Sequence, residues 1–253
     1  MPRHAVSELL LHNFPENGVK FLLHNPGNLR DVMGYLAARY RALPDLSCFD
    51  FARRTIEPDT LIRSDFSHGV TDLLVRLPFR FGGKPATWIK MYLLVEHLSA
   101  HQRHIVPRSL GYAMEAYRLQ ERRWLEKHES LQRFMYEAVV PIVIYTGERT
   151  WQAPTPFRDL VRGGDAFAAF IPSTEPLFLS LPAATEEELV RHAGVLGTVL
   201  HVLQQRHAVI EEFHQLLTKA VGTVEGQVGN DQHRLLELLS YLAALVYHFR
   251  FRV

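Results

Sequence analysis

The sequence lacks the features of secreted, disulfide-rich and membrane proteins. It holds one cysteine, Cys48, in 253 residues, so no disulfide can form within the chain, and a reducing compartment suits it. Its longest apolar stretch, from Leu235 to Phe249, is interrupted by polar residues and is too short to span a bilayer comfortably. The first residues lack the apolar segment of a signal peptide. We therefore expect a soluble, cytoplasmic protein with no membrane partner.

The chain also has no large excess of positive or negative charge. The chain has 28 Lys and Arg against 27 Asp and Glu, for a formal net charge of +1. Nothing in that balance indicates nucleic-acid binding, which would have to depend on a local basic patch. The glycine pairs Gly82-Gly83 and Gly163-Gly164 lack the Lys-Ser pattern of a phosphate-binding loop. With 47% hydrophobic and 22% charged residues, the composition is that of an ordinary globular protein.

Two acidic residues, Asp72 and Glu96, lie in alternating segments on either side of the turn Gly82 to Pro85. An antiparallel hairpin centred on residue 84 pairs residues whose numbers sum to 168, so it places Asp72 opposite Glu96. Opposed residues on one sheet face have Cβ atoms about 4.5–5.5 Å apart. Two carboxylates that close repel each other unless a cation or a proton lies between them.

The hairpin therefore predicts a metal site. A slip of one residue in the register would send the acids to opposite faces. The alternative interpretation, two solvated acids at strand ends, stays open at this point.

The rest of the chain predicts an α/β or α+β fold with a sheet core and a helical C-terminal extension. Helical periodicity covers residues 16–43, with a break at Asn25-Pro26-Gly27, and residues 107–130. The apolar run 138–147 predicts a central strand, and the proline-rich segment 148–182 predicts loops. Helices follow from Thr185 onward, with a loop expected between Gly222 and Gly229.

Four short segments, in this order and spacing, resemble a known family. They are VKFLL at 19–23, SHGVTDLL at 67–74, YLLVEHLS at 92–99 and PIVIYTGE at 141–148. Together they are similar to the blocks of the Rpn (recombination-promoting nuclease)/putative transposase family. The resemblance covers about residues 15–155 and is loose over the C-terminal helices.

The resemblance implies a DNA endonuclease of the PD-(D/E)xK superfamily, with a restriction-endonuclease-like mixed sheet flanked by helices. By position in the motifs, Asp72 and Glu96 would be the catalytic, metal-binding acids, and Glu16 a third ligand of Mg²⁺ or Mn²⁺. The implied domains are a nuclease-like domain at 1–155, a loop-rich connection at 156–184 and a helical extension at 185–253. The apolar stripe of that extension predicts core packing or a homo-oligomer interface.

One position departs from the family pattern. The glutamine expected two residues after the glutamate is Leu98, which can neither orient water nor stabilise developing charge. Gln102, His97 or His101, from the following segment, could take over that role. This departure motivates an alternative function, a catalytically weakened relative that binds DNA or a protein partner. A third possibility is a helical interaction module at 185–253.

Two other groups of residues suggest ligands more weakly. Arg118 and Arg122 lie in a helical segment where bases exceed acids, and they would contact DNA phosphates if they face outward. A solvated helix surface is the simpler explanation. His97, His101 and His104 have a spacing that permits Zn²⁺, but no cysteine or His-Glu-x-x-His pattern accompanies them. A polar loop that contains histidines explains them better.

Overall fold

The structure is a computed structural model that describes residues 14, 16–57, 60–62, 68–70, 73–81, 87–173 and 175–251. The described chain divides into two compact units. The sheet unit comprises residues 47–145 and 149–180, and the helical unit comprises the residues up to Leu46, Thr146–Glu148 and those from Leu181 onward. Each unit is described by itself.

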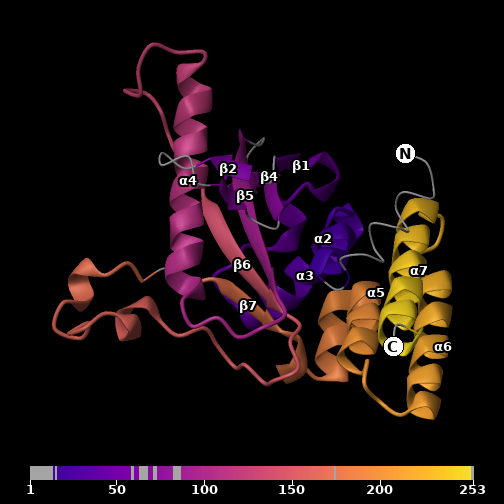
Figure 1. The fold of residues 1–253 in the computed structure, drawn as a ribbon. Helices are drawn as coiled ribbons and strands as arrows, with labels where there is room; N and C mark the ends of the chain where they lie inside the picture. Colours follow the sequence, from indigo (N-terminus) through magenta and orange to yellow (C-terminus); the bar gives the residue numbers. More distant parts are fainter. Residues whose placement is uncertain are drawn as a thin grey trace. The chain divides into compact units, whose positions relative to one another are not determined.

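The sheet unit is built on a mixed five-stranded sheet in the order β1-β4-β5-β6-β7. Its strands are β1 (Thr55–Glu57), β4 (Leu73–Phe81), β5 (Thr87–Leu98), β6 (Val139–Tyr145) and β7 (Leu177–Ser180). The first three strands pair antiparallel, and β5, β6 and β7 run parallel (Figure 1). A separate antiparallel pair joins β2 (Thr60–Ile62) to β3 (His68–Val70). A mixed sheet with associated helices is the predicted fold class, which is thus confirmed.

The hairpin register is also confirmed. β4 and β5 pair from Leu73 opposite Val95 to Phe81 opposite Thr87, and every pair of residue numbers sums to 168. Alternation then separates two faces of β5. Leu93 and Val95 are buried on one face, and Tyr92 and Glu96 are buried on the other.

Helix α4 (Ile105–Leu125) covers the face that carries Tyr92 and Glu96 (Figure 1). Its middle packs through Tyr112 and Ala116 against Leu74 and Tyr92. Its first turn joins a second apolar cluster on the parallel strands, formed by Leu98, Ile105, Val106, Val143, Tyr145, Trp151 and Phe178. Four short 3₁₀ helices complete this unit: Leu46–Cys48, which bridges the boundary, Phe51–Arg53, Phe157–Leu160 and Ala168–Phe170.

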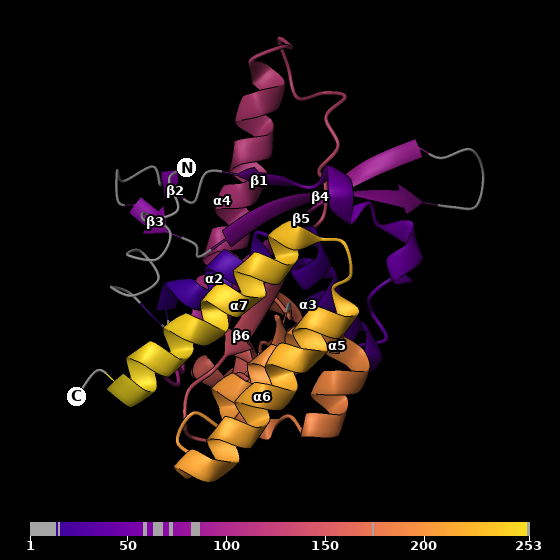
Figure 2. The ribbon, with the colours of Figure 1, turned by 90° about the vertical axis from the view of Figure 1, so that its right-hand side faces the viewer.

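The helical unit consists mainly of α2 (Glu16–Leu23), α3 (Pro26–Arg39), α5 (Glu186–Gln204), α6 (Ile210–Gln227) and α7 (Gln232–Val246). A 3₁₀ turn at Leu181–Ala183 precedes α5, and a π-helical turn at Tyr247–Phe251 follows α7. Figure 2 shows α6 and α7 side by side. α5 begins after Thr185, as expected, and Thr185 forms a reciprocal capping box with Glu188. Among the described residues, no helix meets the length and apolarity needed to cross a membrane.

Polar side chains fasten α3 to α5 and α7 inside the helical unit. α5 is broken at Gly194, where φ is +50°, a backbone conformation that favours glycine. The Asp31 carboxylate accepts a hydrogen bond from the Leu196 N–H just beyond this break, at 3.2 Å, and pairs with Arg234 at 2.5 Å. Burial is the largest influence on Asp31 and raises its pKa despite the nearby Arg234.

Several details of the sequence-based prediction were wrong. α6 continues through Gly222 to Gln227, so no loop begins at Gly222. The segment 148–182 is not all loop, because Leu177–Ser180 forms β7 beside β6. The helix expected over 107–130 ends at Leu125. The predicted domain boundaries at 155 and 185 stay predictions, and the two compact units follow a different division.

Candidate functional site

Glu96 is the one predicted metal ligand whose side chain the structure describes. It is the tenth residue of the β5 segment Thr87–Leu98 and lies beside Val143 in the parallel pairing with β6. Only 2% of the residue is exposed. Removing an ionised carboxylate from water is costly unless it is paired, so the surroundings of Glu96 must include a compensating group.

That group is Arg108, on the second turn of α4. Its Nη2 donates to Oε2 of Glu96 at 2.5 Å, and its Nη1 donates to Oε1 of Gln102 at 2.6 Å. The guanidinium also lies 5.8 Å from the centre of the Tyr112 ring, within the range of a cation–π contact. The first turns of α4 thus bring a fixed positive charge to the buried carboxylate.

The partner acid, Asp72, lies outside the described residues, and so does the side chain of Glu16. The confirmed register ends one residue short of Asp72, at Leu73 opposite Val95. Glu16 is the first residue of α2, in the helical unit. The predicted pairing of these acids with Glu96 therefore stays a prediction.

Carboxylate oxygens are the ligand type that Mg²⁺ prefers, and Glu96 fits that donor set. A carboxylate offers about four lone-pair positions, so its contact with Arg108 is compatible with metal coordination. Within the described part of the chain, no group of three or more His, Cys, Asp or Glu side chains could hold a metal ion. That finding leaves out Asp72 and the Glu16 side chain, and it gives the histidine alternative no support.

Leu98, at the position of the expected glutamine, belongs to the hydrophobic core. It is 4% exposed and packs in the cluster that includes Ile105, Val143 and Trp151. The site thus has an apolar wall two residues beyond Glu96. Of the polar residues suggested as replacements, Gln102 reaches Glu96 through Arg108, and His101 contacts Trp151 with ring centroids 4.5 Å apart.

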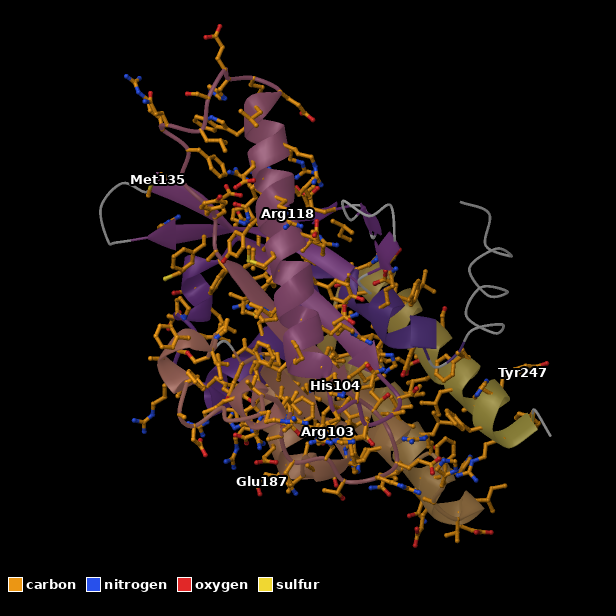
Figure 3. All side chains as sticks on the ribbon, turned by 60° about the vertical axis from the view of Figure 1, so that its left-hand side comes forward. Arg103, His104, Arg118, Met135, Glu187 and Tyr247 are labelled. Carbon is orange, nitrogen blue, oxygen red and sulfur yellow. The ribbon has the colours of Figure 1, made fainter. Side chains whose placement is uncertain are left out.

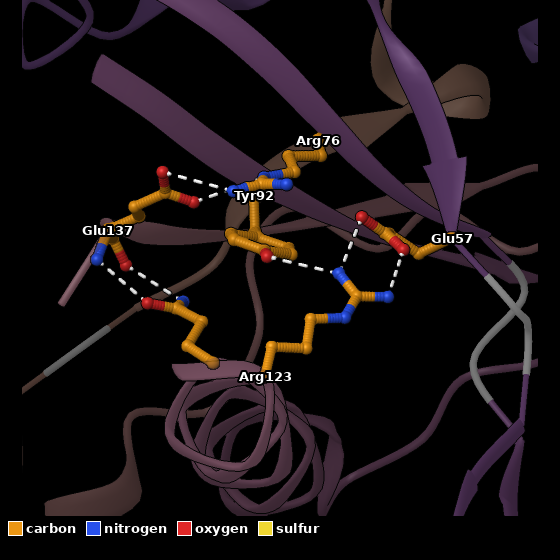
Figure 4. Close-up of polar contacts among 6 residues, drawn as sticks. Glu57, Arg76, Tyr92, Arg123 and Glu137 are labelled. Atoms are coloured by element: carbon orange, nitrogen blue, oxygen red, sulfur yellow. Dashed lines mark hydrogen bonds and ion pairs between the residues drawn. The ribbon is translucent and has the colours of Figure 1, made fainter. Parts of the chain in front are cut away.

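A second polar cluster, which the sequence-based reasoning missed, lies farther along the same face (Figure 4). Arg123 of α4 makes two hydrogen bonds to the buried Glu57 of β1, at 2.5 and 2.9 Å. Arg76 of β4 makes two to Glu137, at 3.2 and 3.3 Å. Tyr92 lies between the two pairs and contacts both arginines. The Glu57 carboxylate, through its hydrogen bonds, raises the pKa of Arg123, and burial raises the pKa of Tyr92.

This second cluster is an internal tie between α4 and the sheet. Gln120 completes it by bonding the backbone N–H and carbonyl of Glu137. Both arginines already have paired acids, so the cluster offers little uncompensated charge to a ligand. Its partners lie 61 and 66 residues apart in the chain, which is why local sequence patterns did not reveal it.

Comparison with known protein families identifies the family of this chain. The family model described as "Putative transposase, YhgA-like" matches residues 19–235. The chain belongs to this family. The match extends well into the C-terminal helices, beyond the segments that first suggested the resemblance. Comparison with curated proteins and with solved structures gave no significant match.

Two of the basic residues on α4 in this YhgA-like protein face solvent. Arg118 lies on α4 (Figure 3). Its side chain is 52% exposed and pairs with Glu115 at 2.5 Å, and Arg122 is also exposed. Arg108 and Arg123, from the same run of bases, instead turn toward buried acids. Fewer bases of α4 are therefore exposed than the sequence suggested. The role of Arg118 and Arg122 in nucleic-acid binding stays a prediction.

Proposed function

We propose that this YhgA-like protein is a metal-dependent nuclease that hydrolyses phosphodiester bonds in DNA. The observation that carries the proposal is Glu96. This carboxylate is buried on the α4 face of the sheet, in a hairpin whose confirmed register leads toward Asp72. Glu96 differs from Glu57, another buried acid that pairs with an arginine, because it lies on the strand whose register leads toward a second acid, and membership of a transposase family supports a role at DNA.

Each residue has a part in the proposed chemistry. Asp72 and Glu96 would hold Mg²⁺ or Mn²⁺, with Glu16 as a third ligand. The ion, when bound, supplies a Lewis acid for the phosphate and lowers the pKa of a water. Arg108 pairs with Glu96 and compensates the charge of its carboxylate. Outside the centre, Arg118 and Arg122 would contact the DNA backbone.

Cleavage of supercoiled plasmid DNA tests this function. The wild type should nick plasmid in Mg²⁺ or Mn²⁺ and not in EDTA, and Asp72→Ala should reduce the rate by about a hundredfold or more. Arg191→Lys is a matched control, because Arg191 forms an exposed pair with Glu187 on α5 in the helical unit. Activity that Asp72→Ala leaves unchanged, or no activity with any divalent ion, would contradict the proposal.

A second candidate function is a catalytically weakened relative that binds DNA without cutting it efficiently. The packing of Leu98 in the core favours it, because a leucine there supplies no polar group to the reacting phosphate. DNA binding by the wild type, without cleavage in Mg²⁺ or Mn²⁺, would identify this function. Self-association through the C-terminal helices is a separate proposal, which sedimentation of the full chain can test.

A further inference from the structure

We propose that Arg108 is the phosphate-binding residue of the candidate site and that Gln102 is its positioning residue. Together they would supply the charge that Leu98 cannot. The inference rests on the proposed function, which requires a DNA phosphate to approach Glu96. It assigns a role to two residues that lie outside the strand motif.

The first support is the geometry of the guanidinium. Arg108 is held at one terminal nitrogen by Glu96 and at the other by Gln102. An arginine has five N–H donors, and these two bonds use two of them. Nε of Arg108 is buried and has no hydrogen-bond partner among the described residues, so it is not the donor that a phosphate would meet. The second N–H group of each terminal nitrogen remains for a phosphate oxygen, on a guanidinium whose orientation is already fixed.

The second support is the difference in exposure within the ion pair. The Arg108 side chain is 33% exposed, whereas the Glu96 side chain is 3% exposed. Arg108 is thus the solvent-facing member of the pair and Glu96 the internal one. A phosphate that approaches this pair from the solvent side of Arg108 meets a guanidinium, the side chain best shaped to bind phosphate.

The third support is the charge balance of the proposed site. The proposed ligands Asp72, Glu96 and Glu16 carry three negative charges and a divalent ion carries two positive charges, so without Arg108 the centre would be negative and would repel a phosphodiester. Arg108 brings the sum to zero and removes that repulsion. Partial burial strengthens the attraction between its guanidinium and a phosphate, because screening by water is reduced.

The apolar wall explains why this charge has to come from α4. Leu98 packs against Ile105 and Val106, the first two residues of the helix. This packing places the next turn, with Arg108, above Glu96. Gln102 precedes the helix and accepts a hydrogen bond from Nη1 of the guanidinium, whereas Glu96 accepts one from Nη2. The packing of Leu98 against α4 thus places an apolar residue on the strand and positions Arg108 on the helix.

The test is DNA binding measured by fluorescence anisotropy, with a short labelled duplex in EDTA and again in Ca²⁺. Arg108→Lys retains the charge beside Glu96 but loses the fork geometry, and we expect it to weaken binding about five- to tenfold. Gln102→Ala leaves the Glu96 pair intact and should weaken binding about two- to threefold. Arg191→Lys is the control and should bind like the wild type. Urea unfolding of each variant shows whether it is folded at the assay temperature.

The outcomes separate this inference from the proposed function. Weaker binding by both variants at unchanged unfolding midpoints supports the role of Arg108. A purely structural ion pair would instead lower the unfolding midpoint of Arg108→Lys and leave the DNA affinity of the folded protein unchanged, which would overturn the inference while the nuclease proposal stands. A wild type that neither binds nor cleaves DNA would overturn both.

Discussion

The substitution Leu98→Gln tests whether the side chain at position 98 belongs to the hydrophobic core or faces the candidate site. In the structure the side chain is 4% exposed within a cluster that contains Val143 and Trp151. Burying a leucine stabilises a fold by about 1.5–3 kcal/mol. Burying an unsatisfied amide costs about 1–3 kcal/mol more. We therefore expect Leu98→Gln to lower the free energy of unfolding by about 3–5 kcal/mol, a large part of the stability of a typical domain.

Urea unfolding followed by circular dichroism gives this quantity, with Leu98→Met as the matched control. Methionine has a similar volume and no hydrogen-bonding requirement, so its cost should stay below about 1.5 kcal/mol. Cleavage by Leu98→Gln, assayed below its unfolding midpoint, should not exceed that of the wild type, because the new amide would point into the cluster. Equal stability of the two variants, or a large gain in cleavage by Leu98→Gln, would show that the side chain at position 98 faces the site instead.

The helical unit offers three further tests by urea unfolding. Tyr241 is fully buried and its hydroxyl has no hydrogen-bond partner among the described residues, so Tyr241→Phe should raise the free energy of unfolding by about 1 kcal/mol; a loss above that size would reveal a bond to the hydroxyl. Asp31→Ala leaves Arg234 without its 2.5 Å partner and the Leu196 N–H of α5 without an acceptor. We expect it to lower the free energy of unfolding by about 2–4 kcal/mol. A loss of only about 0.5 kcal/mol, as for an exposed ion pair, would contradict this account. In Gly34→Ala the new Cβ would lie 2.6 Å from a backbone oxygen of α5, so we expect the free energy of unfolding to fall by about 1–3 kcal/mol. In Gly222→Ala the new Cβ meets nothing within 4 Å inside α6, so we expect the free energy of unfolding to rise by about 1 kcal/mol. The opposite order would refute the α3–α5 packing or the course of α6.

The features that the sequence predicted correctly depend on short-range rules. The hairpin register follows from strict alternation on both sides of one turn, and the residue sum of 168 holds throughout β4 and β5. Helix α5 begins after Thr185, as expected, and Thr185 forms a capping box with Glu188, which lies only three residues away. These elements need no knowledge of the rest of the chain.

The features that the sequence did not reveal depend on distant partners. Strand β7 has four residues between prolines, and it becomes a strand only because β6 offers an edge. Gly222 looks like a helix breaker, yet packing elsewhere along α6 overrides its weak propensity. Arg108 lies in a run of bases that resembles a solvated helix surface, and only the three-dimensional structure shows its bond to Glu96. The sequence thus pointed to Glu96 as a site residue but not to Arg108 as its partner.

The central claim is that Asp72 and Glu96 share a divalent ion. A crystal structure of the full chain grown or soaked in Mn²⁺ tests it most directly, because Mn²⁺ gives an anomalous signal that locates the ion. The account predicts one Mn²⁺ coordinated by carboxylate oxygens of both residues, with Arg108 still within hydrogen-bond distance of Glu96. No ion at that place in saturating Mn²⁺, or Asp72 pointing away from Glu96, would contradict it.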